Sequence, residues 1–159
     1  MIEIEIVGVR VDQIANTPAM RLKESTSPFR YFDIFIGAPE AASIHTALEG
    51  TEMPRPLTHD LFVLALQKID VALSQVVITE MVAGTYYAEM TLSCRGIDTV
   101  ISCRPSDGVA LAVRAQCPIF IKDDLIDDVG KVSPEADEDN ILEEFKDFID
   151  TIKPEDFLA

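Results

Sequence analysis

The chain has 159 residues, which suits one domain with a single core, and 48% of them are hydrophobic. Its formal net charge is −15, and residues 123–159 alone hold 14 acidic and 3 basic side chains. An acidic chain of this kind lacks the basic electrostatic footprint that is typical of nucleic-acid-binding surfaces. No run approaches the roughly 18 apolar residues that span a bilayer, and the N-terminus lacks the features of a signal peptide. The sequence therefore predicts a cytoplasmic protein.

Strands dominate the first third of the predicted fold. Residues 2–11 begin with alternating apolar and acidic side chains, which is typical of a strand with one solvated face. A short returning strand is expected over residues 20–23, and a strong strand over residues 31–36. A helix follows, because Pro39 and the next residue suit a first helical turn and Gly50 suits its end.

The middle of the chain predicts a buried helix followed by strands. Residues 59–69 form a helix whose centre is apolar on every side, so we expect it to be deeply buried. Residues 71–81 and 85–94 are predicted to be strands joined by a hairpin turn. A third, β-branched strand over residues 99–103 should be buried and should lead through a tight turn into the helix 107–116.

The C-terminal quarter divides into a last piece of the domain and an acidic extension. Residues 117–121 predict a short strand, and residues 123–129 one helical turn. From Ile141 onward, apolar residues at helical spacing predict an amphipathic helix with an acidic outer face. We therefore expect a domain over residues 1–130 and an acidic linker with this helix over residues 131–159.

Two helix starts carry the same set of polar groups. The sequence Arg104-Pro105-Ser106-Asp107 precedes one apolar helix, and Arg55-Pro56-Leu57-Thr58-His59-Asp60 precedes the other. Thr58 and Ser106 are predicted to be N-caps, and Asp60 and Asp107 complement the positive helix ends. If both helix starts face one cleft, they pool their arginines, carboxylates, hydroxyls and His59 in a single polar site.

Each of these groups also has a purely structural interpretation. Ser106 and Thr58 cap helices, an acid in a first helical turn complements the helix dipole, and the arginines pair with those acids. Taken together, two arginines suit a phosphate or carboxylate. Asp60 and Asp107 could hold Mg²⁺ through oxygen ligands, and His59 could act as a general base. Such a set is the usual equipment for phosphodiester hydrolysis.

Several other classes of protein are excluded by missing motifs. The chain has no dinucleotide-binding or phosphate-binding glycine loop, no nucleophile elbow and no H-E-x-x-H sequence. Two histidines are too few for a His-rich metal centre. Cys94, Cys103 and Cys117 form no C-x-x-C pair, so they predict buried reduced thiols, not a zinc site or disulfide framework.

Three motifs in order resemble the bifunctional nuclease family: residues 54–60, the sequence Gly84-Thr85-Tyr86-Tyr87-Ala88, and residues 104–107 with their Ala-rich helix. The resemblance covers roughly residues 1–130, and the C-terminal helix looks like the tail of actinobacterial members. One departure is Gly108, where the family usually has Ala. This glycine should loosen the start of its helix slightly.

The resemblance implies an α+β domain with a mixed, largely antiparallel sheet, buried helices, a homodimer, and nuclease activity on RNA and DNA. The first hypothesis is a metal-assisted nuclease in which the arginines clamp the phosphate, the aspartates bind Mg²⁺ and His59 handles protons. Its site residues are Arg55, His59, Asp60, Arg104, Ser106 and Asp107. The alternative hypothesis is a non-catalytic dimeric binding or regulatory module with a small-anion site, which the acidic surface favours.

Overall fold

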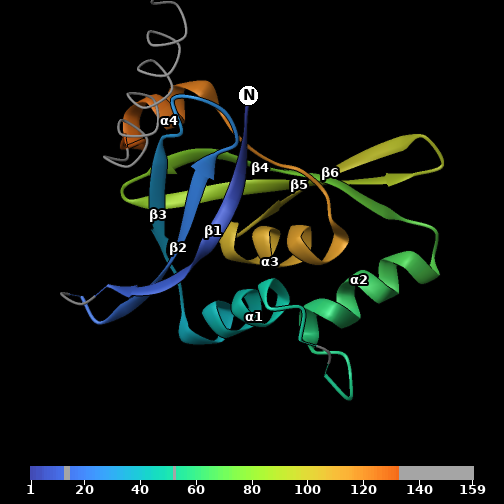
Figure 1. Ribbon diagram of the computed structural model, residues 1–159. Helices are drawn as coiled ribbons and strands as arrows, with labels where there is room; N and C mark the ends of the chain where they lie inside the picture. The colour runs from blue at the N-terminus through green and yellow to red at the C-terminus, as the bar shows by residue number, and fades with distance from the viewer. Residues whose placement is uncertain (13–14, 52, 133–159) are drawn as a thin grey trace, which may run out of the picture.

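The computed structural model describes residues 1–12, 15–51 and 53–132. Over these residues it forms one seven-stranded sheet and four helices (Figure 1), which confirms the α+β class. The predicted amphipathic helix beyond residue 140 lies outside the described residues, as does most of the predicted segment 131–159. Within the described ranges, no helix is both long enough and apolar enough to cross a membrane.

The sheet has the order β3-β2-β1-β7-β4-β5-β6. Its neighbouring strands are antiparallel except for the pair of β4 and β7, so the prediction of a mixed, largely antiparallel sheet is confirmed. The three-residue strand β7 lies between β1 and β4 and joins the two antiparallel halves. The strands are β1 (Ile2–Asp12), β2 (Thr17–Glu24), β3 (Tyr31–Phe35), β4 (Ala72–Val82), β5 (Thr85–Cys94), β6 (Ile97–Cys103) and β7 (Ile119–Ile121).

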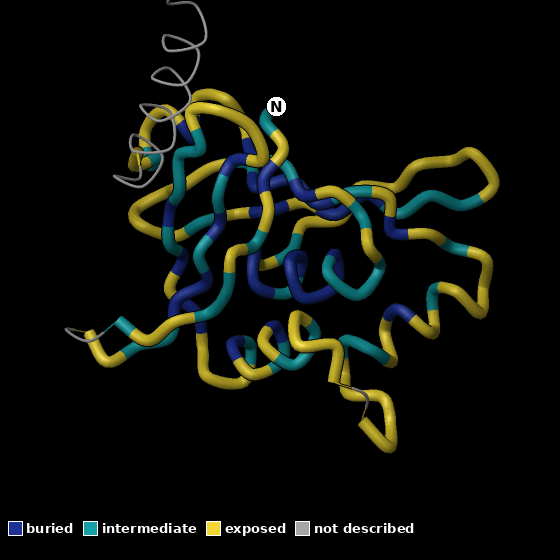
Figure 2. The backbone as a smooth tube through the Cα atoms, in the orientation of Figure 1, coloured by how far each residue is buried: buried dark blue, intermediate teal, exposed yellow. Residues whose placement is uncertain are grey.

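Helix α3 is the centre of the helical layer. It packs against β4 and β5 on one side, while α1 and α2 contact it from the other side (Figure 1). Most of its residues are buried, as the dark tube of α3 in Figure 2 shows. The predicted burial of this helix is therefore confirmed. The helices are α1 (Ala38–Leu48), α2 (Thr58–Lys68), α3 (Pro105–Ala115) and α4 (Asp123–Val129).

Gly108 allows α3 to approach the sheet closely. A Cβ atom at this position would lie 2.8 Å from Val76 Cγ1 on β4 and 3.2 Å from Cys103 Sγ at the end of β6. Real Cβ atoms essentially never approach as closely as the first of these distances, so an alanine would force Val76 to move. The glycine that the resemblance marked as a departure therefore has a packing role.

The three cysteines form no disulfide in the structure and are half-buried, so the burial predicted for them is only partial. Burial raises the pKa of the Cys103 and Cys117 thiols to about 11, and the nearby Asp107 carboxylate adds to the rise at Cys103. Both thiols are therefore protonated and unreactive at neutral pH.

Two predictions of burial are wrong. Helix α2 buries Val63, but Leu61 is 57% exposed, and Phe62 and Leu64 are exposed as well. An apolar helix is buried only where neighbours cover it, and α2 meets α3 and β4 with one face alone. Strand β6 is also exposed along almost its whole length, because it is the edge strand of the sheet and, among the described residues, pairs with β5 alone. Both surfaces therefore present apolar side chains to solvent.

Candidate functional site

The starts of α2 and α3 open into one cleft, as the repeated sequence pattern predicted. The cleft has a volume of about 600 Å³ and lies between these two helix starts and α1. Its polar wall includes Thr58 and His59 from α2, Arg104 and Asp107 from the start of α3, and Ser43 from α1. Side chains far apart in the sequence thus share one solvent-open space.

The first turn of α3 holds Arg104 and Asp107 together. Arg104 is the N-cap in an extended conformation, and Pro105 takes the first helical position, which suits its fixed φ. Ser106 is therefore not the N-cap that the sequence predicted. The Arg104 side chain turns back and donates from Nε to Asp107 Oδ2 at 2.8 Å and from Nη2 to Asp107 Oδ1 at 3.0 Å. Two such bonds form the bidentate pair that a guanidinium and a carboxylate favour.

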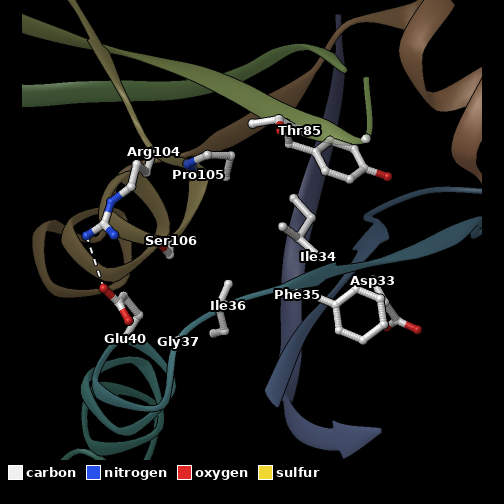
Figure 3. Close-up of a pocket in the computed structure, with 12 residues that line it drawn as sticks. Asp33, Ile34, Phe35, Ile36, Gly37, Glu40, Thr85, Arg104, Pro105 and Ser106 are labelled. Atoms are coloured by element: carbon white, nitrogen blue, oxygen red, sulfur yellow. Dashed lines mark ion pairs between the residues drawn. The ribbon is translucent and has the colours of Figure 1, made fainter. Parts of the chain in front are cut away.

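Arg104 also reaches Glu40, in the first turn of α1. Its Nη2 atom lies 3.1 Å from Glu40 Oε1 (Figure 3), and the Arg104 side chain is 66% exposed. A guanidinium has five N–H donors, and Nη1 has no hydrogen-bond partner within the described ranges. Arg104 can therefore keep both acidic partners and still offer two N–H groups to an anion in the cleft.

His59 lies between Ser43 and Asp107. Its Nδ1 atom is 2.9 Å from Ser43 Oγ, and its Nε2 atom is 3.4 Å from Asp107 Oδ1. Arg114 from α3 donates to Ser43 Oγ at 3.2 Å. Because arginine can only donate, the Ser43 hydroxyl proton is available to Nδ1. The second lone pair of Oγ can equally accept a hydrogen bond from Nδ1–H, so this geometry accommodates the proton of a neutral imidazole on either ring nitrogen.

The pKa of the Asp107 carboxyl reflects this setting. Partial burial alone would raise the pKa, but the hydrogen bonds and charge of Arg104, with a further contribution from His59, lower it below the ordinary value. The same pairing raises the pKa of Arg104. At neutral pH the site therefore presents an ionised Asp107 between a cation and an imidazole.

Asp60 lies at the far end of the hydrogen-bond chain that runs from Asp107 through His59 and Ser43 to Arg114. Arg114 Nε donates to Asp60 Oδ1, and the backbone N–H of Leu57 donates to Asp60 Oδ2 at 2.8 Å. Leu57, not the predicted Thr58, is the N-cap of α2. The hydrogen bond from Arg114 is the largest cause that lowers the pKa of Asp60, and the bond from Leu57 acts in the same direction. Asp60 thus fixes the start of α2 onto α3.

The six predicted site residues therefore separate into four groups. His59 and Arg104 each contact Asp107 in the cleft. Ser106 lines a neighbouring cavity, and Asp60 is held by Arg114. Arg55 is exposed in the loop before α2 and lines neither cavity.

Sequence reasoning missed three residues of the site, Glu40, Ser43 and Arg114. Glu40 and Ser43 are three residues apart on α1 and therefore share a face. This spacing was a signal in the sequence from which a shared position at the site could have been predicted. Arg114 had no local signal, because its partners Asp60 and Ser43 are 54 and 71 residues away in the chain.

The predicted Mg²⁺ site does not fit this arrangement. Asp60 accepts hydrogen bonds from Arg114, and Asp107 accepts them from a different arginine, Arg104. Among the described residues, no group of three or more His, Cys, Asp or Glu side chains is placed to hold a metal ion. A Mg²⁺ ion shared by both aspartates stays a prediction from the sequence.

The comparisons with known proteins agree with the motifs. The profile of the bifunctional nuclease domain matches residues 20–134. Two uncharacterized proteins of Mycobacterium tuberculosis, one from strain CDC 1551 / Oshkosh and one from strain ATCC 25618 / H37Rv, are each 38% identical to the chain over 165 residues. Each match covers 99% of this chain and 98% of the mycobacterial protein.

Proposed function

The chain belongs to the bifunctional nuclease domain family, and we propose that it hydrolyses phosphodiester bonds of RNA or DNA in the cleft around His59. The observation that supports this proposal best is that His59 and Arg104 both contact Asp107 in one solvent-open cleft. These residues combine a cation for the phosphate with an imidazole for proton transfer, which are the two functions that the reaction needs.

Each residue has a distinct role in this proposal. Arg104 Nη1 donates to a non-bridging phosphate oxygen and stabilises the charge that develops on the phosphoryl group. With its own proton on Nδ1, donated to Ser43 Oγ, His59 accepts a proton from the attacking water at Nε2, and the imidazolium that forms passes this proton to the leaving oxygen. Asp107 and Ser43 hold the two edges of the imidazole ring, so they are positioning residues.

Arg104→Ala tests the phosphate contact. We expect about tenfold slower cleavage of a short single-stranded RNA or DNA, because the variant loses the charged donors that face the cleft. Cleavage is measured by gel or by release of a fluorophore at saturating enzyme. Arg95→Ala, which removes an exposed arginine in the β5–β6 turn, is the matched control and should cleave at the wild-type rate. Equal rates for both variants would remove Arg104 from the mechanism.

Chelation tests the metal hypothesis. Every group in the proposed step belongs to the chain, so we expect cleavage to survive dialysis against EDTA with less than a twofold change in rate. Loss of cleavage that added Mg²⁺ restores would instead support the predicted metal-assisted reaction. In that case the Arg104–Asp107 pair would have to open to let a carboxylate bind the ion.

A non-catalytic anion-binding module is the second function to consider. The observation in its favour is that each aspartate already binds an arginine, which leaves neither carboxylate free for a metal ion. Arg104 Nη1 remains as a group that can bind an anion. The net charge of −15 also opposes long-range attraction of a polyanion. Saturable binding of inorganic phosphate that Arg104→Ala abolishes, with no cleavage under any condition, would favour this function.

We also propose that the chain forms a homodimer through the apolar side chains exposed on α2 and on the edge strand β6. Val100 on β6 is 58% exposed, and an exposed strand edge pairs readily with a second strand. Homodimer interfaces are richer in apolar surface than the rest of a protein surface. The cytoplasmic location stays a prediction from the sequence.

Val100→Lys should weaken this dimer at least tenfold, because it places a charge in an apolar contact. The dissociation constant is measured by analytical ultracentrifugation. Val11→Lys is a matched control, since Val11 is also 58% exposed but lies on β1. A wild-type chain that is monomeric at high concentration, or equal effects of both substitutions, would contradict the proposed interface.

A further inference from the structure

A second cavity adjoins the cleft on the other side of the Arg104–Glu40 ion pair. Its volume is about 330 Å³, and Arg104 and Glu40 line both spaces. Figure 3 shows the ion pair at one side of this second cavity and Phe35 with Asp33 at the other. A molecule that extends across the pair would therefore occupy both spaces at once.

The wall of the second cavity is mostly apolar and carries two aromatic side chains. Ile34, Ile36 and Pro105 contribute apolar surface, while Phe35 and Tyr86 contribute rings. Phe35 is 58% exposed, so its ring is available to a ligand. An exposed aromatic ring is the kind of platform on which nucleic-acid bases stack.

Ser106 supplies a polar group inside this wall. The residue is only 7% exposed, and its hydroxyl has no hydrogen-bond partner within the described ranges. No fully enclosed side-chain oxygen or nitrogen in the described chain lacks a partner, so this hydroxyl is open to the cavity that Ser106 lines. A nearly buried hydroxyl without a hydrogen-bond partner lowers the stability of the fold unless a ligand or a water molecule supplies that partner.

The Asp33 carboxylate does not give the cavity a free negative charge. It accepts hydrogen bonds from Arg10 at 2.7 Å and from Arg21 at 2.8 Å. Glu40 is likewise paired with Arg104 through one oxygen. The cavity therefore combines neutralised carboxylates, an open hydroxyl and aromatic surface, a mixture that suits a flat heterocycle with polar edges.

We propose that this second cavity binds the base of one nucleotide whose phosphate contacts Arg104; the position of that phosphate rests on the proposed function. The base stacks on Phe35, and its polar edge hydrogen-bonds the Ser106 hydroxyl and the Glu40 carboxylate, as base edges do with such groups. The volume lies at the lower end of ligand pockets, which suits one base and excludes a duplex.

Saturation-transfer NMR with adenosine 5′-monophosphate tests the proposal on the full chain. We expect saturation to reach the base protons, and we expect ribose 5-phosphate, which lacks the base, to bind at least fivefold more weakly. Phe35→Ala should weaken the binding of adenosine 5′-monophosphate roughly fivefold or more, because it removes a stacking contact. Ser106→Ala should weaken it as well. Tyr87→Ala removes another exposed aromatic side chain, outside the cavity, and should have no effect.

The outcomes separate this proposal from the proposed function. Equal affinities for the nucleotide and ribose 5-phosphate, or unchanged binding in Phe35→Ala, would overturn the base site even if the chain cleaves oligonucleotides. Base-dependent binding that Phe35→Ala weakens would support the base site even if no cleavage occurs, and the nuclease proposal alone would then fail.

Discussion

Replacing His59 with alanine is expected to reduce the turnover number for oligonucleotide cleavage by about 10²- to 10⁴-fold, the range typical of general acid–base groups. The affinity for the oligonucleotide should change much less, because Arg104 and its exposed Nη1 donors remain. The prediction is measured as separate kcat and KM values for a short single-stranded substrate. A fall in kcat with a nearly constant KM identifies a group that acts in the transition state.

The chain offers a matched control for this experiment. His45 is the other histidine of the sequence, and it is exposed on the same side of the fold, on α1. His45→Ala should retain wild-type kcat, since His45 lines neither cavity. If His59→Ala also retains most of the wild-type kcat, proton transfer by the imidazole is excluded and the anion-binding function gains support.

Local sequence signals were sufficient for most of the fold. The alternation of apolar and polar side chains correctly predicted β1, and the turn residues of a hairpin correctly predicted β4 and β5. Both signals lie within a short stretch of sequence. Burial of α2 and β6 could not be predicted in the same way. Whether an apolar surface is covered depends on the order of strands in the sheet, and that order places β6 at the edge.

The candidate site was predictable in outline because its two helix starts repeat one sequence pattern. That repetition correctly suggested that His59 and Asp107 share a cleft. The pattern could not distinguish Asp60 from Asp107, since both are acids in the first turn of an apolar helix. The distinction comes from Arg114, whose long-range contacts leave no mark in the local sequence near Asp60.

This difference between the two aspartates predicts different effects of the same substitution on stability and on cleavage. Asp60→Asn should lower the free energy of unfolding at pH 7 by about 2 kcal/mol, because the nearly buried Arg114 loses its charged partner. Solvent access to Asp60 keeps the loss below the range for fully buried pairs. Asp107→Asn should lower the stability less, because its partner Arg104 is 66% exposed, and should also slow cleavage, since it releases the His59 ring. Asp70→Asn, an exposed position just after α2, is the stability control.

The pH dependence of stability gives this prediction a second test. The folded-state pKa of Asp60 is lowered, so its stabilisation is fully present above the unfolded pKa of about 4 and is lost as the pH falls through the folded value. The gap in unfolding free energy between wild type and Asp60→Asn, measured by urea titration, should therefore be largest near pH 7 and close towards pH 2. A gap that is constant with pH would mean that the ion pair with Arg114 does not stabilise the fold.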